Sequence, residues 1–124
     1  MADITVEFVT VERRIWSGTA TMVVAKTTEG ELGIQPGHEP LLGALDEAGT
    51  VTVYATDGNK RVAAVQGGFL SVTGNKVSIL GEAAEWSDSI DRGEAEKALA
   101  DAGDNEHLAA FARGRLLAIE KAGA

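Results

Sequence analysis

The sequence predicts a mainly β domain followed by a two-helix tail. Up to about residue 87, apolar residues alternate with polar ones at a period of two, and beyond that point they recur every three to four positions. Eleven of the 15 glycines precede residue 82. These observations predict two domains, with short strands in residues 1–87 and a helical hairpin in residues 88–124.

The predicted strands are short and frequently interrupted. Alternating runs begin at Ile4, Val51 and Val77, and two to four polar or glycine residues separate such runs. The pairs Asp57-Gly58 and Gly74-Asn75 are typical of hairpin turns, because these residues tolerate positive φ. Strands with this spacing predict an antiparallel sandwich or a flattened barrel.

The tail opens with a helix-start signal. Asp91 and Glu94 form a capping box, and an apolar face follows it at helical spacing. The members of that face are Ala95, Ala98, Leu99 and Ala102. Residues 101–105 break the helix, and Asp104 or Asn105 can cap a second one, which predicts an antiparallel hairpin. We expect the second helix to bury Leu108, Phe111, Ala112, Leu116 and Ile119.

The hairpin is a weak element by itself. Its apolar face is rich in alanine, and Gly93, Gly103 and Gly114 each lower helix stability by up to ~1 kcal/mol relative to alanine. We therefore expect it to be stable only when it docks on another surface.

Charge and composition exclude several classes of protein. The net charge is −8 and the isoelectric point is about 4.7, which argues against nucleic acid and anionic lipid surfaces as direct partners. The apolar runs are too short for a membrane span, and no export signal precedes the first strand, so we expect no membrane insertion. With no cysteine, a disulfide framework and thiol catalysis are also excluded.

Catalytic and metal-binding motifs are missing as well. The sequence has no phosphate-binding loop and no G-x-S-x-G turn, and His38 and His107 lack the spacing of metal ligands. We therefore expect no catalytic residue and no metal site. The acidic stretch of residues 82–106 is interpreted as a solvated face.

One loop is too rigid for an ordinary connection. Residues 29–42 place three glycines and two prolines among apolar residues, with Pro36-Gly37 typical of a type II turn and Pro40 favouring extended backbone before it. Such a loop holds Glu31 and His38 in fixed positions. His38 either contacts a backbone carbonyl or faces a partner, and the residues alone leave both readings open.

This loop carries a resemblance to a known family. Residues 30–42, GELGIQPGHEPLL, resemble the G-E-[LF]-G-I-x-P-G-H-x-P-L-[LV] signature of the epsilon subunits of bacterial F-type ATP synthases. Residues 8–18 are similar to the opening strand and turn of that family, and residues 67–72 to its G-G-[FI]-x-x-V strand. The likeness covers nearly the whole chain and is to a version of the family with a short tail.

The resemblance implies a fold and a role. The fold is an N-terminal ten-stranded antiparallel β-sandwich followed by a two-helix hairpin. The role is that of a non-catalytic rotor part in the central stalk of a proton-translocating synthase, peripheral on the cytoplasmic face of the cell membrane within the F1 sector. The implied partners are the gamma subunit and the ring of c subunits. The hairpin also meets the alpha and beta subunits when it extends, and there it restrains ATP hydrolysis.

The resemblance carries over to some residues. Glu31 matches the position that contacts the c-ring, and His38 the position that contacts gamma. The family's nucleotide motif [IL]-D-x-x-R-A is matched by Ile90, Asp91 and Ala95, but Glu94 stands where the motif has arginine. A carboxylate repels a phosphate because both are negatively charged, so we expect no cofactor other than weakly bound regulatory ATP. The bases that can replace the missing charge are Arg92, Arg113 and Arg115.

Two other functional classes remain as alternatives to a rotor subunit. One is an isolated β-sandwich that binds a small ligand, which the low aromatic content of 5% disfavours. The other is a stand-alone nucleotide sensor, which Glu94 disfavours. Within the sandwich, we expect Phe69 in the core and Leu70 at a subunit interface.

Overall fold

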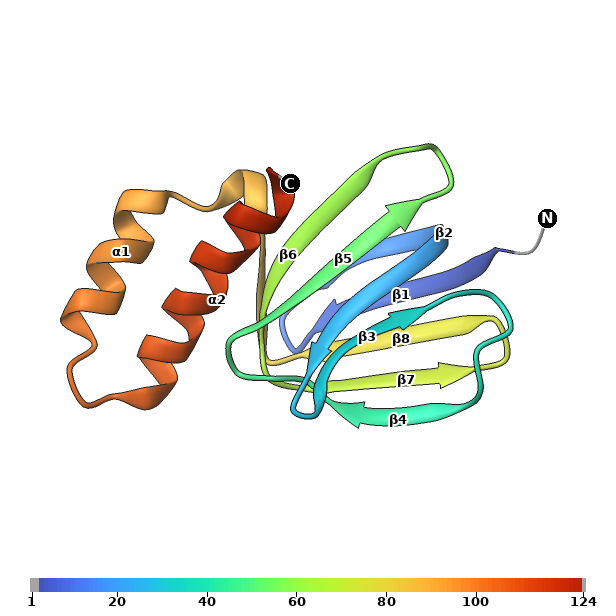
Figure 1. Ribbon diagram of the computed structural model, residues 1–124, viewed down its shortest axis with the longest axis horizontal. Helices are drawn as coiled ribbons and strands as arrows, with labels where there is room; N and C mark the ends of the chain where they lie inside the picture. Colours follow the sequence, from blue (N-terminus) through green and yellow to red (C-terminus); the bar gives the residue numbers. More distant parts are fainter. Residues whose placement is uncertain (1–2, 124) are drawn as a thin grey trace.

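The computed structural model describes residues 3–123 and contains a β-sandwich with a helical hairpin at one end (Figure 1). The first five strands are β1 (Ile4–Thr10), β2 (Arg14–Thr27), β3 (Gly30–Ile34), β4 (Leu41–Ala44) and β5 (Gly49–Ala55). They are followed by β6 (Lys60–Gln66), β7 (Phe69–Thr73), β8 (Lys76–Gly81) and β9 (Ala83–Trp86). A 3-10 turn, η1 (Ser87–Ser89), leads to the helices α1 (Arg92–Asp101) and α2 (Glu106–Ala122).

The sandwich is built around the long strand β2. Its first half pairs with β1, and its second half pairs with β5 on one side and β3 on the other. The order of the strands is β4-β7-β8-β1-β2-β5-β6-β9, with β3 beside β2. One layer therefore contains β4, β7, β8 and β1, the other contains β3, β5, β6 and β9, and β2 belongs to both.

The fold class agrees with the sequence prediction, but two details differ. The described residues form nine strands and not ten, because the chain after β4 makes only an isolated bridge, Leu45 to Thr27, before it turns. The sheet is also not wholly antiparallel, since β1 and β8 run parallel. These two strands lie far apart in the sequence, and hairpin turns constrain only neighbouring strands.

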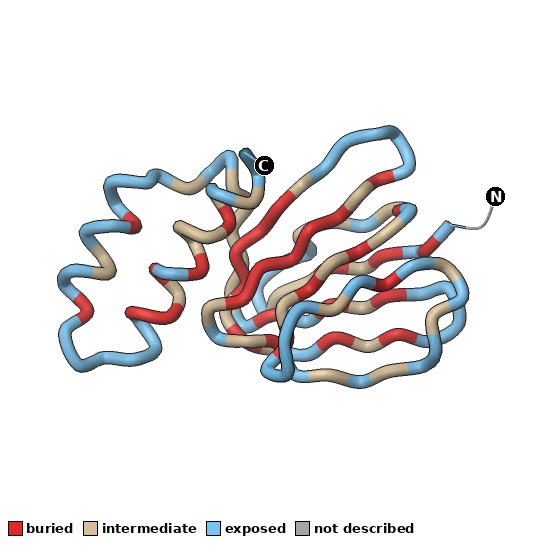
Figure 2. Tube along the Cα trace, in the orientation of Figure 1, coloured by how far each residue is buried: buried red, intermediate tan, exposed pale blue. Residues whose placement is uncertain are grey.

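The core lies between the two layers (Figure 2). Its side chains come from the inward positions of alternating strands, as the period of two predicts. The bulkiest fully buried members include Ile4, Phe8, Ile34, Leu70 and Ile79. The strands β5 and β6 are buried on both faces, because α2 covers the outer face of β6.

The predicted turns are confirmed. Gly58 and Gly74, in the β5–β6 and β7–β8 turns, have φ of 93° and 60°. Gly68 has φ of 105°, and a Cβ there would overlap the carbonyl oxygen of Leu80. Only glycine allows β7 to start this close to β8.

The helix caps are also confirmed. The Asp91 carboxylate accepts from the N–H of Glu94 at 3.0 Å, and Asn105, not Asp104, caps α2 by accepting from the N–H of Leu108 at 3.1 Å. The hairpin turns back at this point, and α2 lies between α1 and the sandwich (Figure 1).

The predicted buried face of the second helix was partly wrong. Leu108 is 57% exposed, and Phe111, Leu116 and Ile119 are only half-buried. The buried positions of α2 are Ala109, Ala110, Ala112, Gly114 and Ala118. Small residues face inward because α2 approaches the sandwich closely: a Cβ on Gly114 would lie 3.1–3.3 Å from backbone atoms of Ala48.

Candidate functional site

The loop between β3 and β4 contains the turn that Pro36 and Gly37 predict. Gly37 has φ of 87°, and the N–H of His38 donates to the carbonyl of Gln35 at 3.1 Å, closing the turn. The N–H of Gly37 donates to the Asn75 side chain at 3.1 Å. The loop is therefore tied to the β7–β8 turn of the other layer.

His38 has a local contact within this loop. Its Nδ1 atom lies 2.7 Å from the carbonyl oxygen of Glu39, and the residue is half-buried. This contact is the structural alternative that the sequence left open. A contact between His38 and a gamma subunit stays a prediction.

Glu31 projects from the sandwich and meets the C-terminal helix. It lies on β3 opposite Lys26 of β2, and its side chain is 53% exposed. Its Oε2 atom lies 2.9 Å from Nζ of Lys121, in the last turn of α2. Sequence reasoning missed this pair, since the only signal was a basic residue at the helix end.

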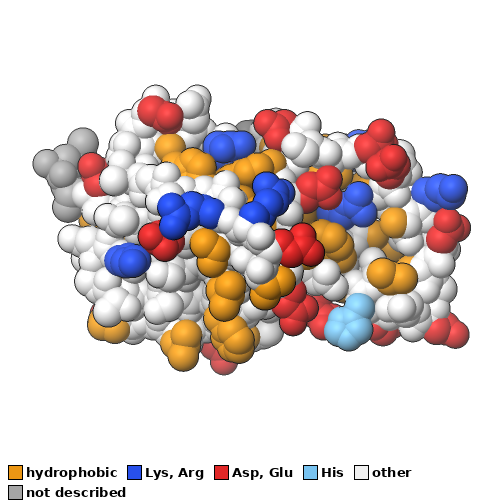
Figure 3. Space-filling view, turned by 180° about the vertical axis from the view of Figure 1, so that it is seen from behind, with side chains coloured by type: hydrophobic (Ala, Val, Ile, Leu, Met, Phe, Trp, Pro, Cys, Tyr) orange, Lys and Arg blue, Asp and Glu red, His pale blue; other side chains and the backbone are white. Residues whose placement is uncertain are grey.

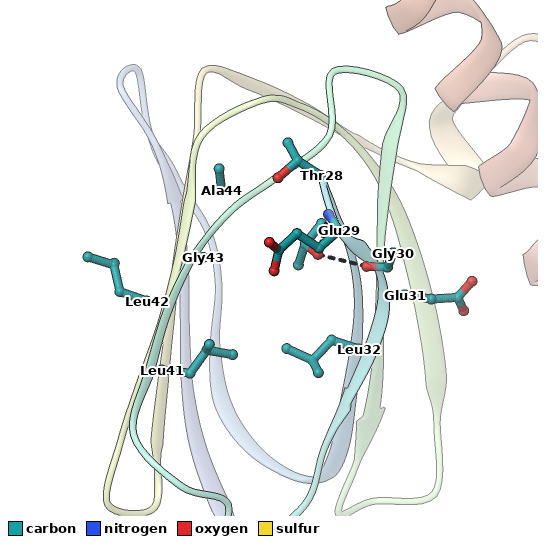
Figure 4. A pocket seen from close by; sticks show the side chains of 10 residues that line it. Thr28, Glu29, Gly30, Glu31, Leu32, Leu41, Leu42, Gly43 and Ala44 are labelled. Carbon is teal, nitrogen blue, oxygen red and sulfur yellow. Dashed lines mark hydrogen bonds between the residues drawn. The ribbon is translucent and has the colours of Figure 1, made fainter.

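A cavity of about 460 Å³ opens between β3 and β4. Figure 4 shows Leu32 and Leu41 pointing toward one another across it, while Glu31 and Leu42 point away from it. Glu31 and Leu42 therefore belong to the outer surfaces at either side of the cavity and do not line its interior.

Exposed apolar side chains gather on the outer face of the β4-β7-β8 layer. Leu42, Phe69 and Leu80 are 74%, 56% and 45% exposed. Phe69 lies opposite both Ala44 and Leu80 in the sheet, and Leu42 shares the face of Ala44. Figure 3, the view from behind, shows hydrophobic side chains along the lower part of the sandwich. We call Leu42, Ala44, Phe69 and Leu80 the outer apolar patch.

This patch corrects the prediction for residues 69 and 70. Leu70 is fully buried and Phe69 is exposed, the reverse of the expectation. The period of two alone does not say which member of a neighbouring pair faces inward, and the pairing of Leu70 with Ile79 decides it. A contiguous apolar surface of this kind is typical of an interaction site.

Three ion pairs join α2 to the sandwich. At its start, Nδ1 of His107 lies 2.9 Å from Oε1 of Glu47, a pair that carries charge when the imidazole is protonated. In the middle, Nε of Arg115 lies 3.2 Å from Oε1 of Glu85, without hydrogen-bond alignment. The third is the Lys121–Glu31 pair at the end of the helix.

The predicted nucleotide residues are spread over the hairpin. Ile90 packs with Phe111 against Val62 and Ala64 of β6. The Asp91 carboxylate is used as the cap of α1, Ala95 is buried, and Arg92 is exposed.

The two arginines of α2 lie apart from one another. Arg113 is exposed and lines a groove of about 340 Å³ with Lys26 and Leu117. The Arg115 guanidinium lies 5.6 Å from the Phe111 ring centre and faces a different hollow, of about 200 Å³. The structure therefore places Arg113 and Arg115 in separate cavities.

Residues 3–123 offer neither a metal site nor a membrane span. No group of three or more metal-ligating side chains occurs in this part of the chain. None of its helices has the length and apolar character needed to cross a bilayer.

Comparison with known proteins finds relatives of this sequence. Residues 3–87 match the family model described as ATP synthase, Delta/Epsilon chain, beta-sandwich domain. The ATP synthase epsilon chain of Rhodococcus jostii is 55% identical, covering 98% of this chain and 100% of the relative. The epsilon chain of Nocardia farcinica is 51% identical, over 96% of this chain and 92% of its own.

Solved structures share the fold. A chain of the Euglena gracilis mitochondrial ATP synthase superposes with a TM-score of 0.78 at 24% identity, covering 100% of this chain and 83% of that one. A chain from the central stalk and c-ring of the Tetrahymena thermophila mitochondrial enzyme gives 0.59 at 18% identity, covering 99% and 98%.

Proposed function

Because the chain belongs to the family of ATP synthase epsilon chains, we propose that it is a non-catalytic subunit of the central stalk of a proton-translocating F-type ATP synthase. In this role it turns with the c-ring and links that rotation to ATP synthesis in F1. The observation that carries the proposal is the likeness to epsilon chains along 98% of the sequence, hairpin included.

The outer apolar patch is the surface assigned to gamma. Leu42, Phe69 and Leu80 expose large side chains that a protein partner can desolvate. The rigid loop that carries His38 is tied to the β7–β8 turn, next to the same layer. Both features support a single gamma interface on this side of the sandwich.

Glu31 is assigned to the c-ring. Its carboxylate projects from β3, which is an edge strand because, within residues 3–123, it pairs only with β2. Contact with the ring places the chain at the cytoplasmic face of the cell membrane, held there by its partners and not by insertion.

The hairpin is assigned to regulation. Small residues and three ion pairs hold α2, a combination that allows release more readily than a bulky apolar interface does. An extended hairpin meets the alpha and beta subunits and restrains ATP hydrolysis. Weak ATP binding at Ile90, Asp91 and Ala95, with help from Arg92, Arg113 or Arg115, belongs to the same proposal.

Co-purification tests the assignment of the apolar patch. We expect the tagged full chain to bring down gamma and the c-ring from membranes, and Phe69→Glu to abolish the recovery of gamma because it places a charge in the desolvated interface. The control is Leu108→Glu, which alters an equally exposed apolar residue on the hairpin. Retention of gamma by the Phe69 variant would show that gamma binds another surface of the chain. Failure of the native chain to bring down either partner would reject the proposed function.

A further inference from the structure

The end of α2 is tied to the sandwich by two polar contacts of a single residue, Lys121. The side chain of Lys121 pairs with Glu31 of β3 at 2.9 Å. Its backbone carbonyl also accepts from Nζ of Lys60, on β6, at 2.8 Å. Lys121 thus contacts two different strands of the sandwich, β3 and β6.

The apolar share of the docking surface is small. The cluster between α2 and the sandwich contains only Val62, Ala64 and Ala118 as fully buried members, with Ile90 and Phe111 packed against it. Alanines bury little area, so ion pairs carry a larger part of the docking energy here than in an ordinary core.

Among the three ion pairs, the one at Lys121 is set apart by its acid. Exposure does not distinguish it, since Lys121 is 23% exposed, Arg115 of the middle pair 18% and His107 of the first pair 71%. Glu47 and Glu85 have no assigned partner outside the chain. Glu31 is the residue that the proposed function gives to the c-ring, and it already holds the hairpin.

We propose that the Glu31–Lys121 pair is a latch that couples the position of the hairpin to the c-ring contact. When the ring engages the Glu31 carboxylate, Lys121 loses its counter-charge and the end of α2 is released. Conversely, a docked hairpin competes with the ring for the same carboxylate. The coupling is reciprocal, as linkage requires. This inference rests on the proposed function for its partner, but the latch itself is a property of the isolated chain.

A buried thiol reports release of the hairpin. The chain has no cysteine, so Val62→Cys introduces a single thiol beneath α2, at a position 1% exposed. Its rate of modification by a thiol reagent measures how often the hairpin opens, even when the open state is rare. Val77→Cys, at a fully buried core position away from α2, reports global unfolding.

The latch is tested by neutralising one carboxylate at a time. In the Val62→Cys background we expect Glu31→Gln to raise the modification rate two- to about fivefold, the range for a partly exposed ion pair. Glu29→Gln, an exposed acid two residues away with no ion pair among the described contacts, leaves the rate unchanged. The exchange of Glu31→Lys with Lys121→Glu restores the slow rate that either change alone accelerates. In the Val77→Cys background none of these variants changes the rate.

Equal rates for Glu31→Gln and Glu29→Gln would reject the latch. It is rejected equally if the exchanged pair fails to restore the slow rate, or if the thiol at position 77 accelerates in parallel.

Addition of a purified gamma–c-ring assembly tests the coupling. We expect it to accelerate modification at position 62 in the chain with Glu31, and to add nothing in the Glu31→Gln variant. Binding is measured separately by co-sedimentation. Absence of binding would reject the proposed function. The latch would then be tested by the modification rates of the isolated chain alone. Binding with equal acceleration in both variants would reject the coupling alone.

Discussion

Glycine occupies the point where the connection from β6 to β7 passes the backbone of β8. At Gly68 a side chain would be excluded twice, by a φ of 105° and by overlap with the Leu80 carbonyl. Gly74 shares the positive φ, at 60°, but has open space around its Cα. The two positions therefore separate the cost of backbone strain from the cost of a steric clash.

We predict that Gly68→Ala destabilises the fold far more than Gly74→Ala. Strain alone costs about 1–2 kcal/mol at Gly74, and at Gly68 the displacement of β8 adds to that cost. Urea denaturation of both variants gives the comparison. Equal losses of unfolding free energy would show that β8 can shift away from a side chain at position 68 without loss of stability.

Glu31 and His38 make exposed or local contacts, so they contribute little to stability. We predict that Glu31→Ala and His38→Ala each lower the unfolding free energy by less than ~1 kcal/mol. Both variants weaken attachment to the stalk or proton-driven ATP synthesis. Thermal melting and synthesis by reconstituted enzyme are measured together, with Glu12→Ala, an exposed acid of the β1–β2 turn, as control. A large loss of stability with normal coupling would assign both residues to folding.

At the scale of elements, local chemistry was predictable and tertiary packing was not. The caps at Asp91 and Asn105 depend on hydrogen bonds within one helical turn, so the sequence contains all that decides them. The buried face of α2 depends on how closely it approaches Ala48 and β6. Gly114 weakens an isolated helix, but in the folded chain it permits this close approach. Periodicity alone does not contain the position of α2 against the sandwich, and it therefore assigned Leu108 to the core.

The candidate site shows the same division. The rigid turn at Pro36-Gly37 follows from two residues and was predictable. The outer apolar patch was not, because it assembles Leu42, Phe69 and Leu80 from three strands that meet only in the folded sheet. The Glu31–Lys121 pair joins residues 90 positions apart, and nothing local in the sequence marks it.

The first helix carries a prediction about nucleotide. Glu94 lies at the exposed start of α1, where the family motif has arginine. We predict that ATP binds the full chain no more tightly than millimolar, and that Glu94→Arg strengthens binding several-fold by adding a phosphate partner. Titration calorimetry measures both, with Glu96→Arg as a control for net charge. Micromolar binding by the native chain would show that Arg92, Arg113 or Arg115 supplies the missing charge.

For the whole molecule, the question is what the hairpin contributes to the sandwich and to the complex. Its removal uncovers Val62 and Ala64 on the outer face of β6, while every strand in the described part of the chain lies before residue 87. The core cluster between the layers contains no residue of the hairpin.

We predict that a chain ending at residue 87 folds and binds gamma, with an unfolding free energy lower by at least ~1.5 kcal/mol from the exposure of Val62. In the assembled enzyme this truncation raises ATP hydrolysis and changes synthesis little, because the restraint is removed and the rotor contacts remain. Hydrolysis and synthesis by the same preparation provide the measurement. Unchanged hydrolysis would mean that the hairpin exerts no restraint.

The sharing of β2 between both layers has a mechanical consequence. The proposed role in the stalk requires the chain to carry torque, and in this chain the patch on β4, β7 and β8 lies in one layer while Glu31 lies in the other. The 14 residues of β2 cross from the first layer to the second as one covalent strand. A twisting load applied at one surface therefore reaches the other along the backbone itself, and the layers cannot slide apart under that load unless the ladder between β2 and its neighbours shears.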